Sequence, residues 1–338
     1  MARRGGWRRV RSGKGFRYVD AHDDPIDDAE ELERIRSLAI PPAWRDVWIS
    51  PNPRAKLQAV GVDAAGRRQY HYSASFREAQ EHEKYDRLIR FGERLPELRE
   101  RMSEHMALDT YARERVCAVA VRLIDLSWFR VGSERPARSR RVYGVTTLTK
   151  RHVSVRGTRV AFRFATKNRA RVRTTLVDEE LAVAVRDLLS LPGGGRVFRY
   201  RRDGELVALT ASQLNEYVRD QLGPEFSAKD FRTWGGTLSA AVALSEYDQP
   251  SSETEAKRVL AAVARRVGER LGNTPAVARA SYIAPAVVEA YTDGRTLADF
   301  RPQALRVVRA RGLDLDPEEA ALLSLLRSAR ARESRRAA

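Results

Sequence analysis

The chain has few of the residues that build disulfide or metal sites. Its 338 residues include one cysteine, Cys117, and five histidines. A single cysteine excludes a disulfide within the chain and indicates a reducing compartment such as the cytoplasm. The histidines are scattered and show no paired metal-ligand spacing. We therefore expect no structural metal and no cofactor, and we expect Cys117 to lie in the core.

Long apolar runs and nucleotide-binding loops are also missing from the sequence. No apolar stretch approaches the roughly 18 residues of a membrane helix. The basic start MARRGGWRRVRSGKG has no apolar run behind it, so we expect no secretory signal. The glycine-rich PGGGRVF lacks the Lys-Ser/Thr of a phosphate-binding loop. These absences disfavour a membrane protein and an enzyme of the P-loop ATPase class.

Basic residues, in contrast, are abundant. Lysine and arginine total 62 against 45 acidic residues, which gives a net charge of +17 and a pI near 10.5. Arginine bias from a GC-rich genome is the alternative explanation, but such bias alone does not require a net excess of charge. We therefore favour a polyanionic partner, namely nucleic acid.

The first 80 residues predict a small sheet-rich domain. Strands are expected at GFRYVDA and DVWISP, and LQAVGVDAAGRRQYHYS predicts two strands joined by an Asp-Ala-Ala-Gly turn. The segment AEELERIRSLAI has helical spacing and stops at Pro41-Pro42. This pattern is typical of an α+β domain with an antiparallel sheet.

Residues 81–338 predict a second, mainly helical domain. Charged helical periodicity runs through EAQEHEKYDRLIRFGERLPELRERMSEHM and continues in YARERVCAVAVRLIDLSWF. The segment from VYGVTTL to RTTLV alternates as a three-stranded antiparallel meander, with turns at Arg156-Gly157 and around Lys167. Helices are expected from DEELAVAVRDLLSL to the end, where the basic tail RSARARESRRAA is expected to fray.

Five polar residues of the second domain are candidates for chemistry. They are Arg130 in FRVGSE, Lys167 in ATKNR, Arg232 in KDFRTWGGT, and Asn273 and Tyr282 in NTPAVARASYI. Each also has an ordinary interpretation. In this interpretation Arg130 is a helix-end cation, Lys167 is a solvated hairpin tip and Arg232 is a surface arginine. Asn273 is then a helix N-cap and Tyr282 a packed aromatic ring.

Together these residue types suit the cleavage of a phosphodiester by a tyrosine. The charge that develops on the non-bridging oxygens must be stabilised, and two arginines match phosphate geometry and stay protonated. An asparagine amide can complete the set of donors. A lysine at a hairpin tip can act as general acid toward the leaving 5′-oxygen. Such a site needs no metal ion.

These motifs, in this order, resemble the type IB DNA topoisomerases, specifically their poxvirus-like bacterial branch, over about residues 15 to 295. The matching segments are LQAVGVDAAGRRQYHY, FRVGSE, VYGVTTL, the Lys167 hairpin, KDFRTWGGT and LGNTPAVARASYI. The resemblance implies that Tyr282 is the nucleophile and that Lys167 is the general acid. It also implies that the scissile phosphate is bound by Arg130, Arg232 and Asn273.

The same resemblance implies an activity and its setting. The expected enzyme relaxes supercoiled duplex DNA through a 3′-phosphotyrosyl intermediate, without ATP or metal. It would act as a monomer in the bacterial cytoplasm, on the nucleoid, without an obligate protein partner. The second domain would have the catalytic fold shared with tyrosine recombinases.

Two positions depart from the family pattern. Asn273 stands where viral and nuclear relatives have histidine, and a neutral amide should stabilise the transition state less. The turn ATKNR lacks the glycines that often flank the hairpin lysine. Lys167 is still preferred over Lys150, because Lys150 precedes the strands.

The first domain and the start of one helix contribute the expected DNA contacts. Alternation in GRRQYHY puts Gln69 on one strand face and Tyr70 and Tyr72 on the other. The resemblance implies that these three residues contact DNA, with Arg67 on the backbone nearby. Lys229, three residues before Arg232, should share its phosphate-facing side. The alternative for the two tyrosines is that they form the core face of the sheet.

Other functions remain open at this stage. A tyrosine recombinase shares the arginines, the lysine and the tyrosine, but usually has histidine where this chain has Lys229. A non-catalytic basic DNA-binding protein of the same fold is the second alternative. A metal-dependent nuclease is disfavoured, because an acidic cluster is missing.

The spacing of Asn273 and Tyr282 gives one structural prediction. Nine residues of unbroken helix separate two side chains by about 13 Å along the axis. Both could not then contact one phosphate. We therefore expect the helix to break before Tyr282, or Tyr282 to be displaced when DNA is absent.

Overall fold

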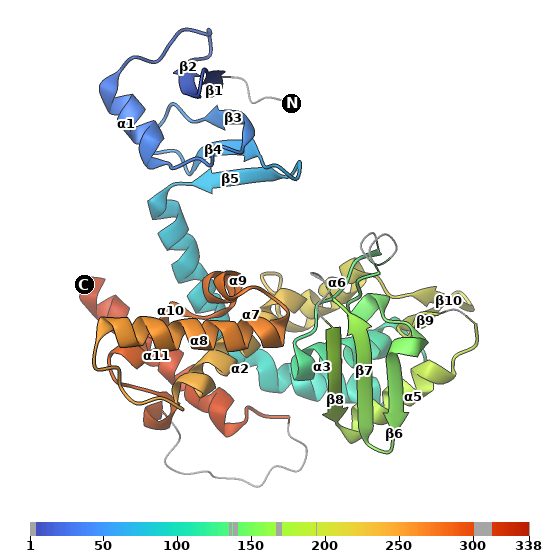
Figure 1. The fold of residues 1–338 in the computed structure, drawn as a ribbon. Helices are drawn as coiled ribbons and strands as arrows, with labels where there is room; N and C mark the ends of the chain where they lie inside the picture. Colours follow the sequence, from blue (N-terminus) through green and yellow to red (C-terminus); the bar gives the residue numbers. More distant parts are fainter. Residues whose placement is uncertain are drawn as a thin grey trace. The chain divides into compact units, whose positions relative to one another are not determined.

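A computed structural model describes residues 5–134, 137, 141–166, 171–193, 195–300 and 313–337. The chain divides into two compact units, Met1–Lys84 and Tyr85–Ala338 (Figure 1). The division lies inside the long helix α2, Ala74–Met106. No helix among the described residues is long and apolar enough to cross a membrane.

The first unit is a five-stranded antiparallel sheet with one helix. Its elements are β1 (Trp7–Ser12), β2 (Gly15–Val19), α1 (Ala29–Ser37), β3 (Arg45–Ile49), β4 (Leu57–Val62) and β5 (Arg68–Tyr72). The strands are ordered β2-β1-β3-β4-β5. Strand β1 was not predicted, because its arginines interrupt the apolar alternation. The other strands and α1 lie where the sequence predicted them.

One face of this sheet packs against α1. Ile49 of β3 lies beside Ala59 of β4, and both pack against Ile35 of α1. Helix α1 is capped at its start by the Asp28 side chain, which accepts from the Glu31 N–H. Helix α1 therefore fixes which face of the sheet is buried, and the opposite face is left for other contacts.

The second unit is mainly helical. Its α-helices after α2 are α3 (Arg113–Ser127), α5 (Glu179–Ser190), α6 (Ala211–Leu222), α7 (Ala228–Leu244), α8 (Glu253–Leu271), α9 (Pro275–Tyr282), α10 (Pro285–Thr292) and α11 (Pro317–Ala337). Short 3₁₀ helices are η1 (Val145–Thr147), η2 (Lys150–His152) and η4 (Leu297–Phe300). Cys117 is buried in α3 as expected, and burial raises the pKa of its thiol to about 12.

Two separate antiparallel sheets accompany these helices. The three-stranded sheet has the order β6 (Val153–Arg156), β7 (Arg159–Ala165) and β8 (Arg171–Val177), which confirms the predicted meander (Figure 1). Gly157 forms the first turn in the left-handed region, with φ of 57°. The second sheet is a hairpin of β9 (Arg199–Arg202) and β10 (Glu205–Ala208), where the sequence predicted only helices.

The C-terminal tail is a folded element rather than a frayed end. Its residues continue α11, which buries an apolar stripe of Ala321, Leu322, Leu325 and Leu326. The prediction of a frayed tail is wrong because it considered only the basic residues. The apolar positions one turn upstream supply the packing that holds the helix.

Candidate active site

Helix α7 carries Arg232 and packs closely on the neighbouring segments because of two consecutive glycines. A Cβ atom at Gly236 would lie 2.8 Å from the carbonyl oxygen of Tyr282. A Cβ atom at Gly235 would lie 2.1 Å from the ring of Trp128. The Gly-Gly pair therefore permits both contacts, at some cost in helix propensity.

Arg232 is held by main-chain oxygens on two other segments. Its guanidinium donates to the carbonyls of Trp128 and Leu271, the latter at 2.9 Å. Trp128 is the C-cap of α3 and adopts a left-handed conformation, with φ of 55°. Leu271 is the last residue of α8, where helix carbonyls lack an intrahelical partner. The side chain is 4% exposed, so its geometry is set by these contacts.

Arg130 lies in the loop after α3 and reaches the same helix end. Its Nη2 donates to the Gly272 carbonyl at 2.8 Å and to Oδ1 of Asn273. Gly272 is the C-cap of α8, with φ of 63°. The C-terminus of α8, which carries a partial negative charge, thus orients both arginines.

Neither guanidinium forms an ion pair with a carboxylate among the described residues. Burial lowers the pKa of Arg130 and of Arg232, and the positive charge of Arg232 further lowers that of Arg130. Arginine nevertheless stays protonated in proteins. One buried and one half-buried positive charge without a carboxylate partner form a site that favours an anion.

Asn273 has one bonded and one unpaired polar atom. Its Oδ1 accepts from Arg130, and this fixes the orientation of the amide. Its Nδ2 is buried and has no hydrogen-bond partner among the described residues. Buried N–H donors without a partner are rare in folded proteins, so an unpaired donor beside two arginines indicates a missing acceptor.

Tyr282 is the last residue of α9 and lies against Arg232. The Arg232 guanidinium carbon is 5.1 Å from the centre of the Tyr282 ring. The Thr237 hydroxyl donates to the Tyr282 carbonyl at 3.1 Å. Burial raises the pKa of the phenol, but Arg232, Lys229 and Arg130 outweigh it, and the pKa is lowered overall. The surrounding positive charge therefore makes loss of the phenol proton easier than in an isolated tyrosine, and the phenolate is the nucleophilic form.

Helix α9 runs unbroken from Pro275 to Tyr282, and Ile283 then turns to extended backbone, so the expected break before Tyr282 is wrong. The alternative, a displaced Tyr282 when DNA is absent, stays a prediction. The N-cap of α9 is Thr274, whose side chain accepts from the Val277 N–H, so the N-cap interpretation of Asn273 is also wrong. Arg130 binds Asn273 while its charge acts on Tyr282.

Arg130, Arg232 and Tyr282, but not Asn273, line a pocket of about 470 Å³. Its walls are Arg130, Val131, Ser212, Asn215, Arg219, Ser227, Ala228, Lys229, Arg232 and Tyr282. None of these residues is acidic. Lys229, in the first turn of α7, shares the pocket side with Arg232 as expected.

Lys167 lies outside the described residues, but Thr166, directly before it, lies near Gly272. Thr166 is buried, and a Cβ atom at Gly272 would lie 3.4 Å from both the Thr166 hydroxyl and Arg130 Nη1. The other candidate, Lys150, lies in η2 and donates to the Leu191 carbonyl. The amine of Lys150 is therefore already engaged.

In the first unit, Asp63 binds two of the residues that are predicted to contact DNA, Arg67 and Gln69. Hydrogen bonds from the main chain and side chain of Arg67 lower the pKa of Asp63 to about 2. The Gln69 Nε2 donates to the same carboxylate at 2.9 Å. These hydrogen bonds do not use the side-chain oxygen of Gln69, which can therefore still accept a hydrogen bond.

The predicted tyrosines face solvent rather than the core. Tyr70 is 49% exposed and Tyr72 is 38% exposed, and their ring centres lie 6.4 Å apart. Across the sheet, Tyr70 pairs with Val60, Val60 with Trp48, and Trp48 with Arg8, so these residues share one face. This surface, called the outer face, carries six exposed arginines and tyrosines: Arg8, Arg17, Arg45, Arg68, Tyr70 and Tyr72. The core-face interpretation is wrong.

Sequence reasoning missed the groups that orient the arginines. Three are main-chain carbonyls, of Trp128, Leu271 and Gly272, and carbonyls leave no side-chain signal. The Gly-Gly of RTWGGT was a readable signal, because paired glycines inside a helix usually mark a close approach. Among the described residues, no group of three histidine, cysteine or acidic side chains is placed to hold a metal ion.

Comparisons with known proteins match both units. The family model "Eukaryotic DNA topoisomerase I, catalytic core" matches residues 73–301, and "Bacterial DNA topoisomerase IB, N-terminal domain" matches residues 15–63. The chain is 30% identical over 291 residues to DNA topoisomerase 1B of Acanthamoeba polyphaga mimivirus. That similarity covers 84% of this chain and 86% of the viral protein. Helix α11 lies outside both family models.

Proposed function

The chain belongs to the type IB DNA topoisomerases, and we propose that it relaxes supercoiled duplex DNA by cutting, rotating and rejoining one strand. The arginine pair is the observation that carries the proposal. Arg130 and Arg232 are oriented by main-chain oxygens, have no carboxylate partner among the described residues, and lie beside Tyr282. This arrangement suits an anionic group that is attacked by the tyrosine.

In the proposed reaction, the Tyr282 oxygen attacks the scissile phosphorus. A tyrosyl oxygen–phosphorus bond forms and the bond from phosphorus to the 5′-oxygen breaks. Arg130, Arg232 and the Nδ2 of Asn273 donate to the non-bridging oxygens, where negative charge develops. The lowered pKa of Tyr282 assists loss of its proton.

Lys167 is proposed to supply the proton that the leaving 5′-oxygen requires. The products of the first step are then a 3′-phosphotyrosine and a free 5′-hydroxyl. The phosphoester bond energy is retained in the tyrosyl ester, so religation is the reverse attack and needs no ATP. Rotation of the cut strand between the two steps releases supercoils.

The first unit is proposed to bind DNA through its outer face and β5. Tyr70 and Tyr72 present exposed rings, and Gln69 of β5 is held by Asp63, which follows β4. Exposed arginines of the outer face can neutralise phosphates, while polar side chains on β5 contact base edges. Arg67 and Lys229 are proposed to bind the DNA backbone. We propose that the enzyme acts as a monomer.

The proposal is tested with a supercoiled plasmid in EDTA and without ATP. The wild type should relax it, and a denaturing gel should trap a covalent adduct that maps to Tyr282. Tyr282→Phe should bind the same DNA but form no adduct. Adduct formation by this variant would assign the nucleophile elsewhere, and DNA binding without any wild-type adduct would favour the non-catalytic alternative.

A further inference from the structure

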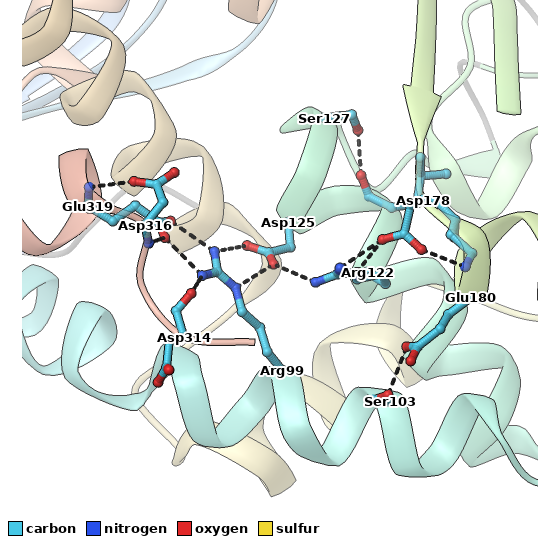
Figure 2. A network of polar contacts seen from close by, with 12 residues as sticks. Arg99, Ser103, Arg122, Asp125, Ser127, Asp178, Glu180, Asp314, Asp316 and Glu319 are labelled. Carbon is cyan, nitrogen blue, oxygen red and sulfur yellow. Dashed lines mark hydrogen bonds and ion pairs between the residues drawn. The ribbon is translucent and has the colours of Figure 1, made fainter. Parts of the chain in front are cut away.

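A buried ionic network joins the C-terminal helix to the rest of the second unit (Figure 2). Arg99 of α2 donates to both oxygens of Asp125 on α3, at 2.9 and 3.2 Å. The same guanidinium donates to both oxygens of Glu319 on α11, at 2.8 Å each, and to the Asp314 carbonyl. Arg99, Asp125 and Glu319 are each less than 10% exposed.

Glu319 also holds α7 through a tryptophan. The indole N–H of Trp234 donates to Glu319 Oε1 at 3.1 Å. The Trp234 ring is 2% exposed and so close to α2 that a Cβ atom at Gly92 would lie 2.4 Å from it. The Glu319–Trp234 hydrogen bond is therefore directional and is shielded from water.

Trp234 and Arg232 lie on different sides of α7. Two residues correspond to about 200° of rotation around a helix. On the pocket side, α7 is held by the bonds of Arg232 to the Trp128 and Leu271 carbonyls. On the other side, it is held by Glu319. Contacts on opposite sides fix the rotation of α7, which decides where Arg232 and Lys229 lie in the pocket.

We propose that Glu319 is a positioning residue for phosphodiester cleavage, and this rests on the proposed function. Through the indole of Trp234 it sets the rotation of α7, and so aligns Arg232 with the scissile phosphate and with Tyr282. Glu319 touches none of the reacting atoms. It comes from a helix that neither family model includes.

The test uses full-length Glu319→Gln and Trp234→Phe with a nicked-strand substrate that traps the adduct. Single-turnover cleavage should slow by between about tenfold and a hundredfold, because small misplacements of catalytic groups have effects of this size. DNA affinity should change far less than the cleavage rate, because the contacts of the first unit are untouched. The pH at which cleavage is half-maximal should rise, because a displaced Arg232 depresses the pKa of Tyr282 less. Lys229 lies on the same helix and moves with Arg232, whereas Arg130, the other cation facing Tyr282, remains in place.

The two variants differ in their risk to folding. Glu319→Gln leaves one acceptor oxygen where the carboxylate has two, so Arg99 and Trp234 compete for it and both bonds weaken. Trp234→Phe keeps the Arg99 pair and removes only the indole donor. If Glu319→Gln does not fold, Trp234→Phe decides. The double variant should be no slower than the slower single variant, since both weaken the same Glu319–Trp234 link. Additive effects would instead indicate loss of packing around the smaller ring and would overturn the proposal.

Arg327→Ala is the matched control on the same helix. Arg327 pairs with Glu93 at the exposed surface and should leave cleavage unchanged. A lower final yield of adduct at an unchanged rate would mean that the variants only reduce the folded fraction, and this would refute positioning. Unchanged rates in both variants would refute it as well. Absence of an adduct with the wild type would contradict the proposed function itself.

Discussion

At the scale of single residues, the site combines two arginines that are fixed by main-chain carbonyls with one amide N–H that has no hydrogen-bond partner among the described residues. Arg130 and Arg232 are fixed by carbonyls, while Nδ2 of Asn273 is buried without a partner among the described residues. Resemblance identified these side chains from the sequence alone. It could not predict their orientation, because the orienting groups are main-chain atoms.

Asn273→Asp separates the donor role of this residue from its structural role. The carboxylate keeps the shape and the bond from Arg130, so the melting temperature should not fall. It removes the N–H donor and adds negative charge, so single-turnover cleavage should slow by about a hundredfold or more. Asn273→Ala, which lacks both functions, should lower cleavage and stability together. A normal cleavage rate in Asn273→Asp would show that Nδ2 does not bind the phosphate.

At the scale of elements, helix α7 combines several roles within one short stretch. Residues 232–237 supply Arg232, which is proposed to bind the phosphate, a link to α11, two close approaches and a bond to the Tyr282 carbonyl. Periodicity predicted this helix, and it also predicted the β6–β7–β8 meander. It missed β1 and the β9–β10 hairpin, because the arginine-rich strands β1 and β9 lack a clear apolar alternation. The stability of α11 comes from tertiary packing that local pattern does not reveal.

Gly236→Ala tests the close packing of α7 on Tyr282. In an exposed helix this change would stabilise by about 1 kcal/mol. Here the new methyl would meet the Tyr282 carbonyl at 2.8 Å, so we expect destabilisation by about 1–3 kcal/mol and slower cleavage. Thermal unfolding and adduct kinetics measure the two effects.

Ser239→Ala, one turn further along α7, provides the control. Its hydroxyl is buried without a hydrogen-bond partner among the described residues, so removing the hydroxyl should leave cleavage unchanged. If Gly236→Ala behaves like this control, α9 adjusts freely and the close approach is not required for activity.

At the scale of the whole molecule, charge is the property that the sequence predicted most directly. The net charge of +17 predicted a polyanionic partner, and the family identification agrees. Composition could not show where the charge is used. Strand register in the first unit shows where part of this charge lies, because it gathers Arg8, Arg17, Arg45 and Arg68 on the outer face with the two tyrosines.

Removing single arginines from the outer face should change how DNA binding depends on salt. Arg17→Ala and Arg45→Ala should each weaken binding and reduce the slope of log affinity against log salt by about one. Titration of duplex DNA at several NaCl concentrations gives the slope. Arg327→Ala removes the same charge from α11 and should leave the slope nearly unchanged. Equal slopes in all three variants would mean that net charge, rather than the outer face, governs binding.

The use of main-chain carbonyls at the end of α8 has a consequence for how such enzymes diverge. Every residue supplies a carbonyl, so the anchors of Arg130 and Arg232 survive most replacements of the side chain at position 271. The left-handed backbone of Gly272 is the exception, because few other residues adopt it without strain. Selection on this part of the site therefore acts on backbone shape. Related chains can differ widely in sequence along α8 and still hold the two guanidinium groups in the same place.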